Sequence, residues 1–503
     1  MFEQAPKNRA ATPWLDLIYG LAFAILLGSA LWALLDHLRI VDLALSTPYP
    51  LVYSESLSID RALQIPDLHR LYPASFGASP LRISSQPPLF PALLAPLVQG
   101  VAPSDAFAAA RSLSIAAFLI AGLASAGTVF GLTRSVGGAI AAASLLWLFP
   151  QLQLASILAA PDAVALAFGT LGLCSVALLG ARTDRVGNFA VAASGIFFTL
   201  CIAAQPPFVV APLAAAAAWL VHRNRRIAAL SMLAGMAIAC TAFTLALQAV
   251  TDGGFVRHLL DFGLPDWSKT NAVGFLVNQT LRSGLLMIPC LMFFITEPLG
   301  ARYAPARPAF VLMATALVMT VLASRVGSLW PVTLPLSAAT CIVFGVVVGW
   351  LRNVRWVAAL AVVFAMLQID TLKDWRADDF LPDLNRRFRA ARDVAALDEK
   401  FRAAGGPILT DEYIGLLSLE GSAPVIYPLE FNMLHQRGAW SVDELVAAIE
   451  RREFALVAWY EPIDRNDRYI MTRWPEEVRK AVYRTYYDGG YLADAVIYLP
   501  AKP

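Results

Sequence analysis

Two carboxylates are candidate catalytic groups because each lies at the end of a long apolar segment. Glu55 follows the first apolar segment, in the stretch YSES. Asp162 lies in LASILAAPDAVALAFG, where no other residue within ten positions is charged. Burying an ionisable side chain in hydrocarbon costs at least ~2.5 kcal/mol, so such residues indicate a function. Two carboxylates at one membrane face could act as a general base and as an acceptor-orienting or metal-binding group. The structural alternative for Asp162 is a helix cap.

Arginines predicted on the same side of the membrane could bind a phosphate, because the forked guanidinium matches phosphate oxygens. Arg325 is the strongest candidate, since it occupies the short turn SRVGSLWP between two apolar segments. Arg82 and Arg111 are weaker candidates, because arginines at membrane interfaces often extend toward lipid headgroups.

His258 and Tyr53 are further substrate-binding candidates on this side. A histidine could also bind a metal, but no histidine pair has the spacing of metal ligands. A solvated surface histidine is the alternative for His258. The aromatic belt that marks membrane interfaces is the alternative for Tyr53.

The composition is that of a polytopic membrane protein. Of 503 residues, 58% are hydrophobic and only 15% are charged, which excludes an ordinary soluble protein. Eleven apolar segments are predicted as α-helical membrane spans. They cover residues 14–35, 106–131, 135–154, 162–181, 187–204, 207–222, 227–250, 282–297, 308–324, 329–350 and 354–370.

The short basic loops predict the orientation, because cytoplasmic loops are enriched in Lys and Arg. With the N-terminus inside as an uncleaved signal anchor, these loops face the cytoplasm. The long polar loop 39–105 then lies outside, and so does the C-terminal region. Within this loop, PPLFPALLAPLV is too short to span and is predicted to lie along the membrane surface. We therefore expect a bacterial inner-membrane protein with its candidate site on the periplasmic face.

Residues 371–503 are predicted to form a separate periplasmic α/β domain after a transmembrane domain of residues 1–370. They hold 40 of the 76 charged residues. PILTDEY and FALVAWY are typical of buried strands, and SVDELVAAIERRE is typical of a capped helix. The stretch YPLEFNMLHQRGAW is predicted as a loop, in which Asn432 and Trp440 could bind an acceptor sugar. The alternative is a loop that packs on the membrane domain.

The sequence contains no nucleotide-binding or hydrolase motif: we find no Walker motif, Rossmann glycine pattern, HExxH or GxSxG. The predicted cytoplasmic loops are too short to build a nucleotide-binding domain. A site on the outer face would have no access to nucleotide sugars or ATP, so a lipid-linked substrate is expected.

Several stretches resemble the GT-C membrane glycosyltransferases, especially the protein O-mannosyltransferases, aminoarabinose transferases and Rgt-type lipopolysaccharide sugar transferases. The matching stretches are YSES with Glu55, SQPPLFPALLAPL, AARSLSIAAFLIAG, APDAVAL with Asp162, and SRVGSLWPVTLPLSAA. The resemblance extends over nearly the whole chain, including the C-terminal region.

The resemblance implies an inverting transfer of a sugar from a polyprenyl-phosphate donor to a lipid or glycan acceptor. Glu55 would be the general base, Asp162 the second carboxylate, and Arg325 and Arg82 would stabilise the phosphate. The sequence departs from the family's pattern at two places, one that contacts the lipid phosphate and one that binds the metal in metal-using members. Gln86 stands where some relatives have a phosphate-contacting Lys or His, and Glu55 lacks the adjacent carboxylate of metal-using members. No cofactor is assigned, although a divalent metal remains compatible with the pattern.

Two other functions are consistent with the sequence. A transporter or flippase of a lipid-linked glycan would use the same charges to line a path, but it would favour polar residues at mid-membrane depth. A catalytically inactive scaffold could bind glycan through its C-terminal domain. No nucleic-acid partner is indicated.

Overall fold

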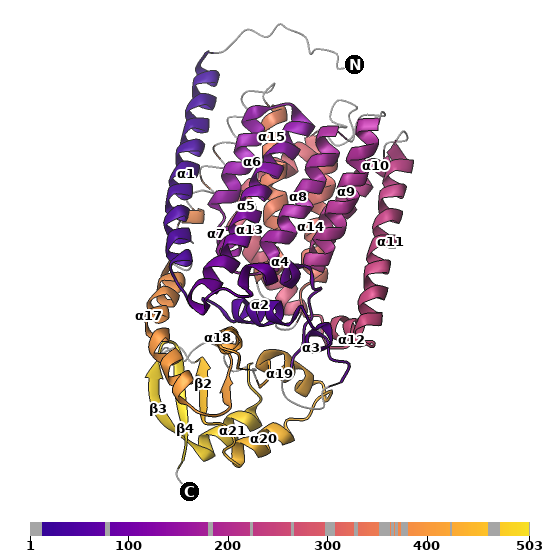
Figure 1. The fold of residues 1–503 in the computed structure, drawn as a ribbon. Coiled ribbons are helices and arrows are strands. Elements are labelled where there is room, and N and C mark those ends of the chain that lie inside the picture. The colour runs from indigo at the N-terminus through magenta and orange to yellow at the C-terminus, as the bar shows by residue number, and fades with distance from the viewer. Residues whose placement is uncertain are drawn as a thin grey trace.

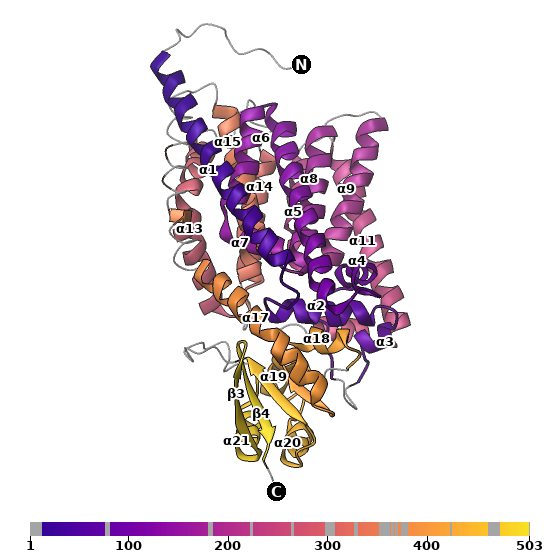
Figure 2. The ribbon, with the colours of Figure 1, turned by 60° about the vertical axis from the view of Figure 1, so that its left-hand side comes forward.

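The computed structural model describes residues 13–75, 81–179, 185–221, 225–262, 266–296, 307–325, 330–351, 363, 367, 371–373, 381–422, 425–460 and 473–501. It consists of a helix bundle and a smaller α/β domain at one end of it (Figure 1). Helix α1 begins at the opposite end of the bundle and runs toward the α/β domain, as Figure 2 also shows.

The bundle helices are α1 (Pro13–Leu45), α5 (Pro103–Thr133), α6 (Val136–Leu148), α7 (Pro150–Ile157), α8 (Pro161–Leu179), α9 (Arg185–Ala204), α10 (Val210–Val221), α11 (Arg226–Val250), α13 (Lys269–Thr296), α14 (Arg307–Leu322) and α15 (Leu334–Leu351). Most bundle helices coincide with the predicted apolar segments, but α13 begins well before its segment, and segment 135–154 is divided into two helices. The eleventh predicted span, residues 354–370, lies almost wholly outside the described residues.

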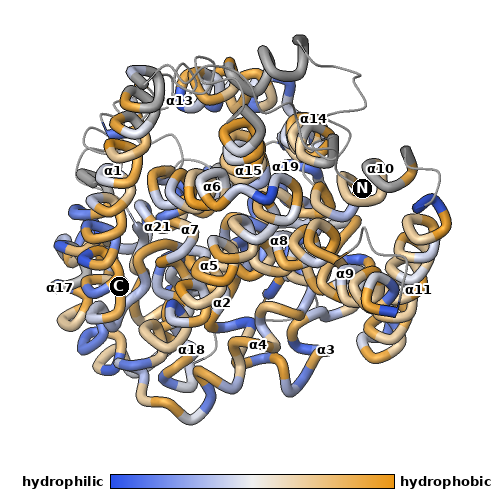
Figure 3. The backbone as a smooth tube through the Cα atoms, turned by 90° about the horizontal axis from the view of Figure 1, so that it is seen from above, coloured by the Kyte–Doolittle hydropathy of each residue, from blue (hydrophilic) through white to orange (hydrophobic). Residues whose placement is uncertain are grey.

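Among the described residues, six helices are long and apolar enough to cross a membrane. A seventh span results if α6 and α7 are counted together, although they are bent by 73°. Pro150 starts α7, and proline cannot supply the N–H that would continue α6. The chain is therefore a membrane protein, while eleven spans stay a prediction. Seen from above, most residues of the bundle helices are hydrophobic (Figure 3).

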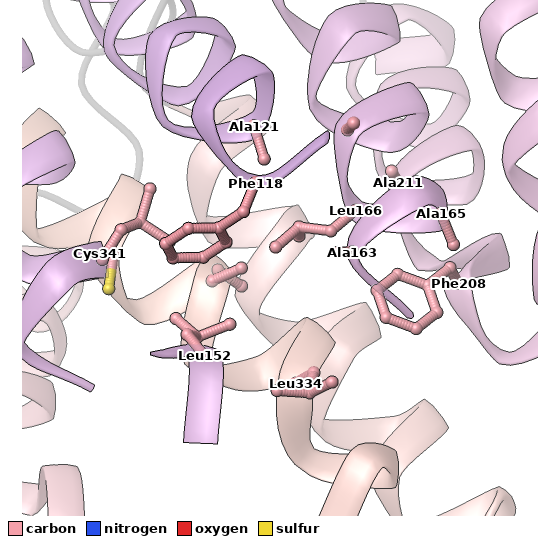
Figure 4. Close-up of a cluster of buried hydrophobic side chains, with 14 of the residues drawn as sticks. Phe118, Ala121, Leu152, Ala163, Ala165, Leu166, Phe208, Ala211, Leu334 and Cys341 are labelled. Atoms are coloured by element: carbon pink, nitrogen blue, oxygen red, sulfur yellow. The ribbon is translucent and has the colours of Figure 1, made fainter. Parts of the chain in front are cut away.

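Small residues allow the central helices α5 and α8 to approach closely. A Cβ built on Gly131 would lie 2.7 Å from the carbonyl carbon of Ala177, and one on Gly127 would lie 2.6 Å from Cys174 Sγ. Close backbone contact of this kind stabilises helix pairs in membranes, where the hydrophobic effect gives little. Larger side chains, including Phe118, Leu166 and Phe208, then fill the adjoining space (Figure 4).

The long polar loop folds into three short helices between the bundle and the α/β domain: α2 (Tyr53–Gln64), α3 (Leu68–Leu71) and α4 (Leu89–Val98). The loop begins later than predicted, because α1 continues to Leu45. In α4, the buried residues Phe90, Leu94 and Val98 recur every four positions and so share one helix face. The stretch predicted to lie on the membrane surface is thus a short helix that packs on protein.

The C-terminal domain contains one four-stranded sheet in the order β1-β2-β4-β3. Strands β1 and β2 pair in parallel, and the other pairs are antiparallel. The elements are α17 (Leu381–Ala403), β1 (Ile408–Thr410), α18 (Ile414–Leu419), α19 (Pro428–Gln436), α20 (Asp443–Glu450), β2 (Leu456–Tyr460), α21 (Glu476–Thr485), β3 (Tyr486–Leu492) and β4 (Ala495–Pro500).

Buried polar contacts attach this domain to α2. Gly415 lies so close to Ser56 that a Cβ added to Gly415 would be 2.7 Å from the carbonyl oxygen of Ser56. Asp60 accepts hydrogen bonds from Ser418 Oγ (2.6 Å) and from the Tyr427 hydroxyl. Since Asp60 is fully buried, these contacts fix the domain against the loop.

Candidate active site

A cavity of about 730 Å³ separates the helix bundle from the C-terminal domain. We call its two sides the bundle wall and the cap wall. The polar residues of the bundle wall are Gln151, Asp162, Gln205, Asn278, Gln279, Arg282 and Thr333. Those of the cap wall include Tyr53, Arg61, Gln86, Arg387, Glu412, Glu430 and Arg473. The volume is in the range of small-molecule binding sites.

Helix α2 forms part of the cap wall through one face. Tyr53, Leu57 and Arg61 recur every four residues and all line the cavity. The Tyr53 hydroxyl donates a 2.8 Å hydrogen bond to Glu430 Oε2. Arg61 Nη1 donates to Gln86 Oε1 at 3.2 Å, and Arg61 Nη2 lies 3.6 Å from Glu430 Oε1. The structure therefore places Tyr53 and Gln86, both predicted site residues, in the cavity.

The C-terminal domain contributes two carboxylates that are paired with arginines. Glu412 Oε2 accepts a 2.7 Å hydrogen bond from Arg473 Nη1, and Glu412 Oε1 lies 3.9 Å from Arg387 Nη1. Burial raises the pKa of Glu412 and of Glu430 above the ordinary glutamate value, against the opposing effect of the neighbouring arginines. Four arginines and three carboxylates thus face the cavity.

Asp162 lies in the first turn of α8 and lines the bundle wall. The residue is only 6% exposed, and its Oδ1 has no hydrogen-bond partner among the described residues. Gln205 lies within hydrogen-bonding range of the carboxylate. The helix N-terminus also stabilises its negative charge. Asp162 therefore combines a place in the cavity lining with a buried carboxylate oxygen that has an unused acceptor position.

Glu55 occupies a closed site behind the cavity. It is fully buried, and each carboxylate oxygen accepts two hydrogen bonds. Oε1 accepts from Arg111 Nε (2.8 Å) and the Ala159 amide (2.9 Å). Oε2 accepts from Arg111 Nη2 (2.8 Å) and the Leu51 amide (2.7 Å). All four acceptor sites of the Glu55 carboxylate are therefore occupied, and the side chain has no exposed surface. It cannot reach a substrate hydroxyl in this conformation.

Arg111 is likewise enclosed. Its remaining N–H groups donate to the carbonyl oxygens of Ala44, Thr47 and Tyr49 at 2.6–2.7 Å. All five guanidinium N–H groups are therefore used within the protein. Phosphate binding, the role predicted for Arg111, is incompatible with this geometry.

The other two predicted phosphate ligands also lie away from the cavity lining. Arg82 is buried and donates from Nε (2.8 Å) and Nη2 (3.2 Å) to the two oxygens of Asp60. Arg325 forms an isolated β-bridge with Trp267, and its carbonyl oxygen accepts a hydrogen bond from Asn271. Neither arginine is among the described residues that surround the cavity. Arg82 instead helps Asp60 to hold the loop and the C-terminal domain together.

Asn432 and Trp440, the predicted acceptor-binding residues, pack within the C-terminal domain, Asn432 buried and Trp440 half-buried. YPLEFNMLHQRGAW is not a loop, because most of it forms helix α19. Asn432 is buried, and the Trp440 ring packs edge-on against Phe431 with centroids 5.0 Å apart. Neither residue lines the described part of the cavity. Proline at the helix start and apolar residues at helical spacing were the overlooked signals.

His258 is a buried structural residue rather than a surface ligand. It starts a π-helical turn, His258–Phe262, after α12 (Gly254–Arg257). Its Nδ1 accepts from the Ser84 amide at 3.1 Å, and its Nε2 lies 2.8 Å from the Pro73 carbonyl oxygen. These two bonds define a neutral ring with the proton on Nε2. Burial lowers the pKa of His258 to about 4.

This histidine predicts a loss of stability in mild acid. The unfolded chain binds a proton near pH 6.5 and the folded chain only near pH 4, so stability falls as the pH drops through that window. The full loss amounts to roughly 3 kcal/mol. His258→Gln keeps a donor for Pro73 but does not titrate. Thermal unfolding in detergent should show that the stability of the wild type relative to this variant falls as the pH is lowered from 6.5 to 4. A stability difference that does not change with pH would exclude the coupling between His258 protonation and folding.

Two arginines of the site were missed although the sequence carried a signal for each. Arg282 lies within α13, four residues after Asn278 and seven after Phe275, so the three share one helix face, and all three line the cavity. The predicted span began at residue 282, so the two residues of this face before Arg282 were left outside it. Arg61 shares the four-residue spacing of the α2 face. Arg387 and Arg473 enter the cavity only through the fold of the C-terminal domain, which no local pattern reveals.

The described residues contain no group of three or more His, Cys, Asp or Glu side chains that could hold a metal ion. Asp162 is the single carboxylate of the bundle wall as defined above. The other two cavity carboxylates are paired with arginines or a tyrosine hydroxyl. This donor set does not fit a metal centre of several protein ligands.

No protein-family model matches the chain, and no curated protein matches it by sequence. Several solved structures match the chain in fold. A crystal structure of ArnT from Cupriavidus metallidurans in the apo state has a TM-score of 0.63 at 12% identity, covering 94% of this chain and 97% of that one. The same protein bound to undecaprenyl phosphate has a TM-score of 0.60 at 13% identity, covering 97% and 98%.

The Archaeoglobus fulgidus oligosaccharyltransferase tethered to an acceptor peptide has a TM-score of 0.52 at 11% identity, covering 94% of this chain and 74% of that one. Both proteins are GT-C glycosyltransferases. Identities this low establish the fold alone. The chain therefore has the fold of GT-C membrane glycosyltransferases over nearly its whole length, which confirms the resemblance predicted from its sequence.

Proposed function

We propose that the protein is an inverting glycosyltransferase that moves a sugar from a polyprenyl-phosphate donor to a lipid or glycan acceptor. The observation that carries the proposal is the cavity, which is lined by four arginines and by Asp162, a carboxylate with a buried oxygen that has no described partner. The fold supports it, since neighbours of this fold were solved with undecaprenyl phosphate and with dolichol phosphate. The bacterial inner membrane, with the cavity on the periplasmic side, is the corresponding location.

Asp162 is the general base in this proposal. The acceptor hydroxyl must lose a proton as its oxygen attacks the anomeric carbon. Of the three cavity carboxylates, Glu412 and Glu430 already accept hydrogen bonds from Arg473 and Tyr53. Asp162 has an oxygen without a partner in the described structure, so it can accept the hydroxyl proton. Glu55 then acts as a positioning residue that fixes the chain around α2 and Ala159.

The arginines of the cavity stabilise the leaving phosphate. The bond from the anomeric carbon to the phosphate oxygen breaks as the new glycosidic bond forms, so negative charge grows on the phosphate. Arg282 projects from the bundle wall, whereas Arg61, Arg387 and Arg473 lie on the cap wall. Arg282 on one wall and the cap-wall arginines on the other can bind phosphate oxygens from opposite sides. Gln86 supplies a neutral hydrogen-bonding group beside Arg61.

The proposal is tested by incubating the protein, in membranes, with a radiolabelled polyprenyl-phosphate hexose and a lipid extract of its host. Transfer should release polyprenyl phosphate and move the label to a second product, both visible by chromatography and mass spectrometry. The rival function, a flippase, would move the intact lipid-linked sugar across proteoliposomes without cleaving it. Translocation with no release of polyprenyl phosphate would overturn the transferase.

A further inference from the structure

Two buried glutamines of the bundle wall are not explained by acid–base chemistry or by phosphate binding. Gln151 and Gln279 are 5% and 3% exposed, and both line the cavity. Burying a carboxamide costs several kcal/mol unless it is hydrogen-bonded. Each of the two glutamines therefore needs hydrogen-bond partners within the bundle.

We propose that Gln151, oriented by Gln279 and Ser337, is a specificity-determining residue that accepts a hydrogen bond from a hydroxyl of the donor sugar. The inference rests on the proposed function and deepens it. It assigns the donor sugar to the class of neutral, hydroxylated hexoses or pentoses, recognised through hydroxyl groups rather than through a charged substituent.

The hydrogen bonds around Gln151 fix the direction of its amide group. Gln151 Nε2 donates to Gln279 Oε1 at 3.2 Å and to Ser337 Oγ. Gln279 is itself fixed, because its Nε2 donates to Ser283 Oγ at 3.0 Å and to Ser337 Oγ at 3.2 Å. Both N–H groups of Gln151 are thus used, and a flip of the amide would place its oxygen against Gln279 Oε1, where two acceptors would meet.

The oxygen of Gln151 is the group left for a ligand. No hydrogen bond to Gln151 Oε1 exists among the described residues, although the side chain lines the cavity. A preoriented carbonyl oxygen can accept a hydrogen bond from a hydroxyl group without rearranging when the ligand binds. The exposed Asn278 on the same wall offers a second neutral carboxamide.

The charges of the bundle wall favour a neutral sugar. Asp162 is its single carboxylate, and the proposed mechanism requires that carboxylate for the acceptor proton. An ammonium group on the donor sugar would compete for Asp162 and would face Arg282 on the same wall. A carboxamide discriminates between hydroxyl patterns without adding charge, because a site built to bind a hydroxyl rejects the analogue that lacks it.

The test compares donor binding rather than transfer, so it does not depend on the acceptor. Full-length protein in nanodiscs is titrated with polyprenyl phosphate, with a polyprenyl-phosphate hexose and with its monodeoxy analogues. In the wild type, the hexose should bind more tightly than bare polyprenyl phosphate. Gln151→Leu should reduce that preference about 5- to 10-fold while leaving the affinity for bare polyprenyl phosphate unchanged.

The deoxy analogues identify the hydroxyl concerned. One of these analogues should bind the wild type about 5- to 10-fold more weakly than the hexose does. The same analogue should bind Gln151→Leu as tightly as the hexose does, since the hydrogen bond is already absent in this variant. Gln153→Leu is the matched control: Gln153 is a buried glutamine of α7 that bonds to the Trp147 carbonyl and does not line the described cavity. It should leave the sugar preference intact.

The two levels of the proposal fail differently. If neither polyprenyl phosphate nor its hexose binds the wild type, the proposed function itself is wrong. If both bind but Gln151→Leu keeps the wild-type preference, the assignment of Gln151 is overturned. Tighter binding of a polyprenyl-phosphate aminosugar than of the neutral hexose would overturn the sugar class.

Discussion

Asp162→Asn is expected to reduce sugar transfer by about 10²- to 10⁴-fold, the usual contribution of a general base. The substitution keeps the size of the side chain and its ability to cap α8, but it removes the proton acceptor. Affinity for polyprenyl phosphate should change little, because the arginines that face the phosphate remain. The loss should therefore appear in kcat rather than in KM. Single-turnover transfer from a radiolabelled donor measures it directly.

A matched control separates chemistry from folding. Asp105 also lies in the first turn of a long helix, α5, but it is exposed and outside the described cavity lining. Asp105→Asn changes the charge at a helix N-terminus by the same amount, and it should retain wild-type transfer. If Asp162→Asn also transfers at the wild-type rate, the base must be another carboxylate, with Glu412 and Glu430 the next to test.

The sequence singled out a loop that contributes to the cavity lining, but the structure places its first carboxylate, Glu55, in a closed ion pair behind the cavity. An acidic residue just beyond an apolar segment was interpreted as functional, but a buried charge also requires a partner for structural reasons. The sequence could not show that the partner is Arg111, which lies 56 positions away and binds Glu55 with two hydrogen bonds. A structural ion pair and a catalytic carboxylate leave the same local pattern.

The fold was more predictable than the pairing of charges. Apolar segments of bilayer length predicted the helices, because hydrophobicity over about 20 residues determines insertion. The cavity depends instead on which helix faces turn inward and on how the C-terminal domain packs against α2. Arg387 and Arg473 reach the cavity through that packing alone. Only the periodic polar faces of α2 and α13 could have been found in advance.

The pair formed by Glu55 and Arg111 is expected to control stability rather than chemistry. Arg111→Leu should destabilise the protein by about 3–5 kcal/mol, because it leaves a fully buried carboxylate without its counter-charge. Glu55→Gln should also destabilise it, since an amide N–H group must then face a donor from Arg111, Leu51 or Ala159. The folded fraction of Glu55→Gln should still transfer sugar, because the cavity lining is unchanged.

A double-mutant cycle in detergent, followed by thermal unfolding, tests this assignment. The double variant Glu55→Leu with Arg111→Leu buries no charge, so it should be about 1–3 kcal/mol more stable than the sum of the single leucine variants predicts. It should stay below the wild type, because the carbonyl oxygens of Ala44, Thr47 and Tyr49 lose their donor. If Glu55→Gln instead unfolds like the wild type and transfers no sugar, Glu55 acts in catalysis and must reach the cavity in another conformation of α2.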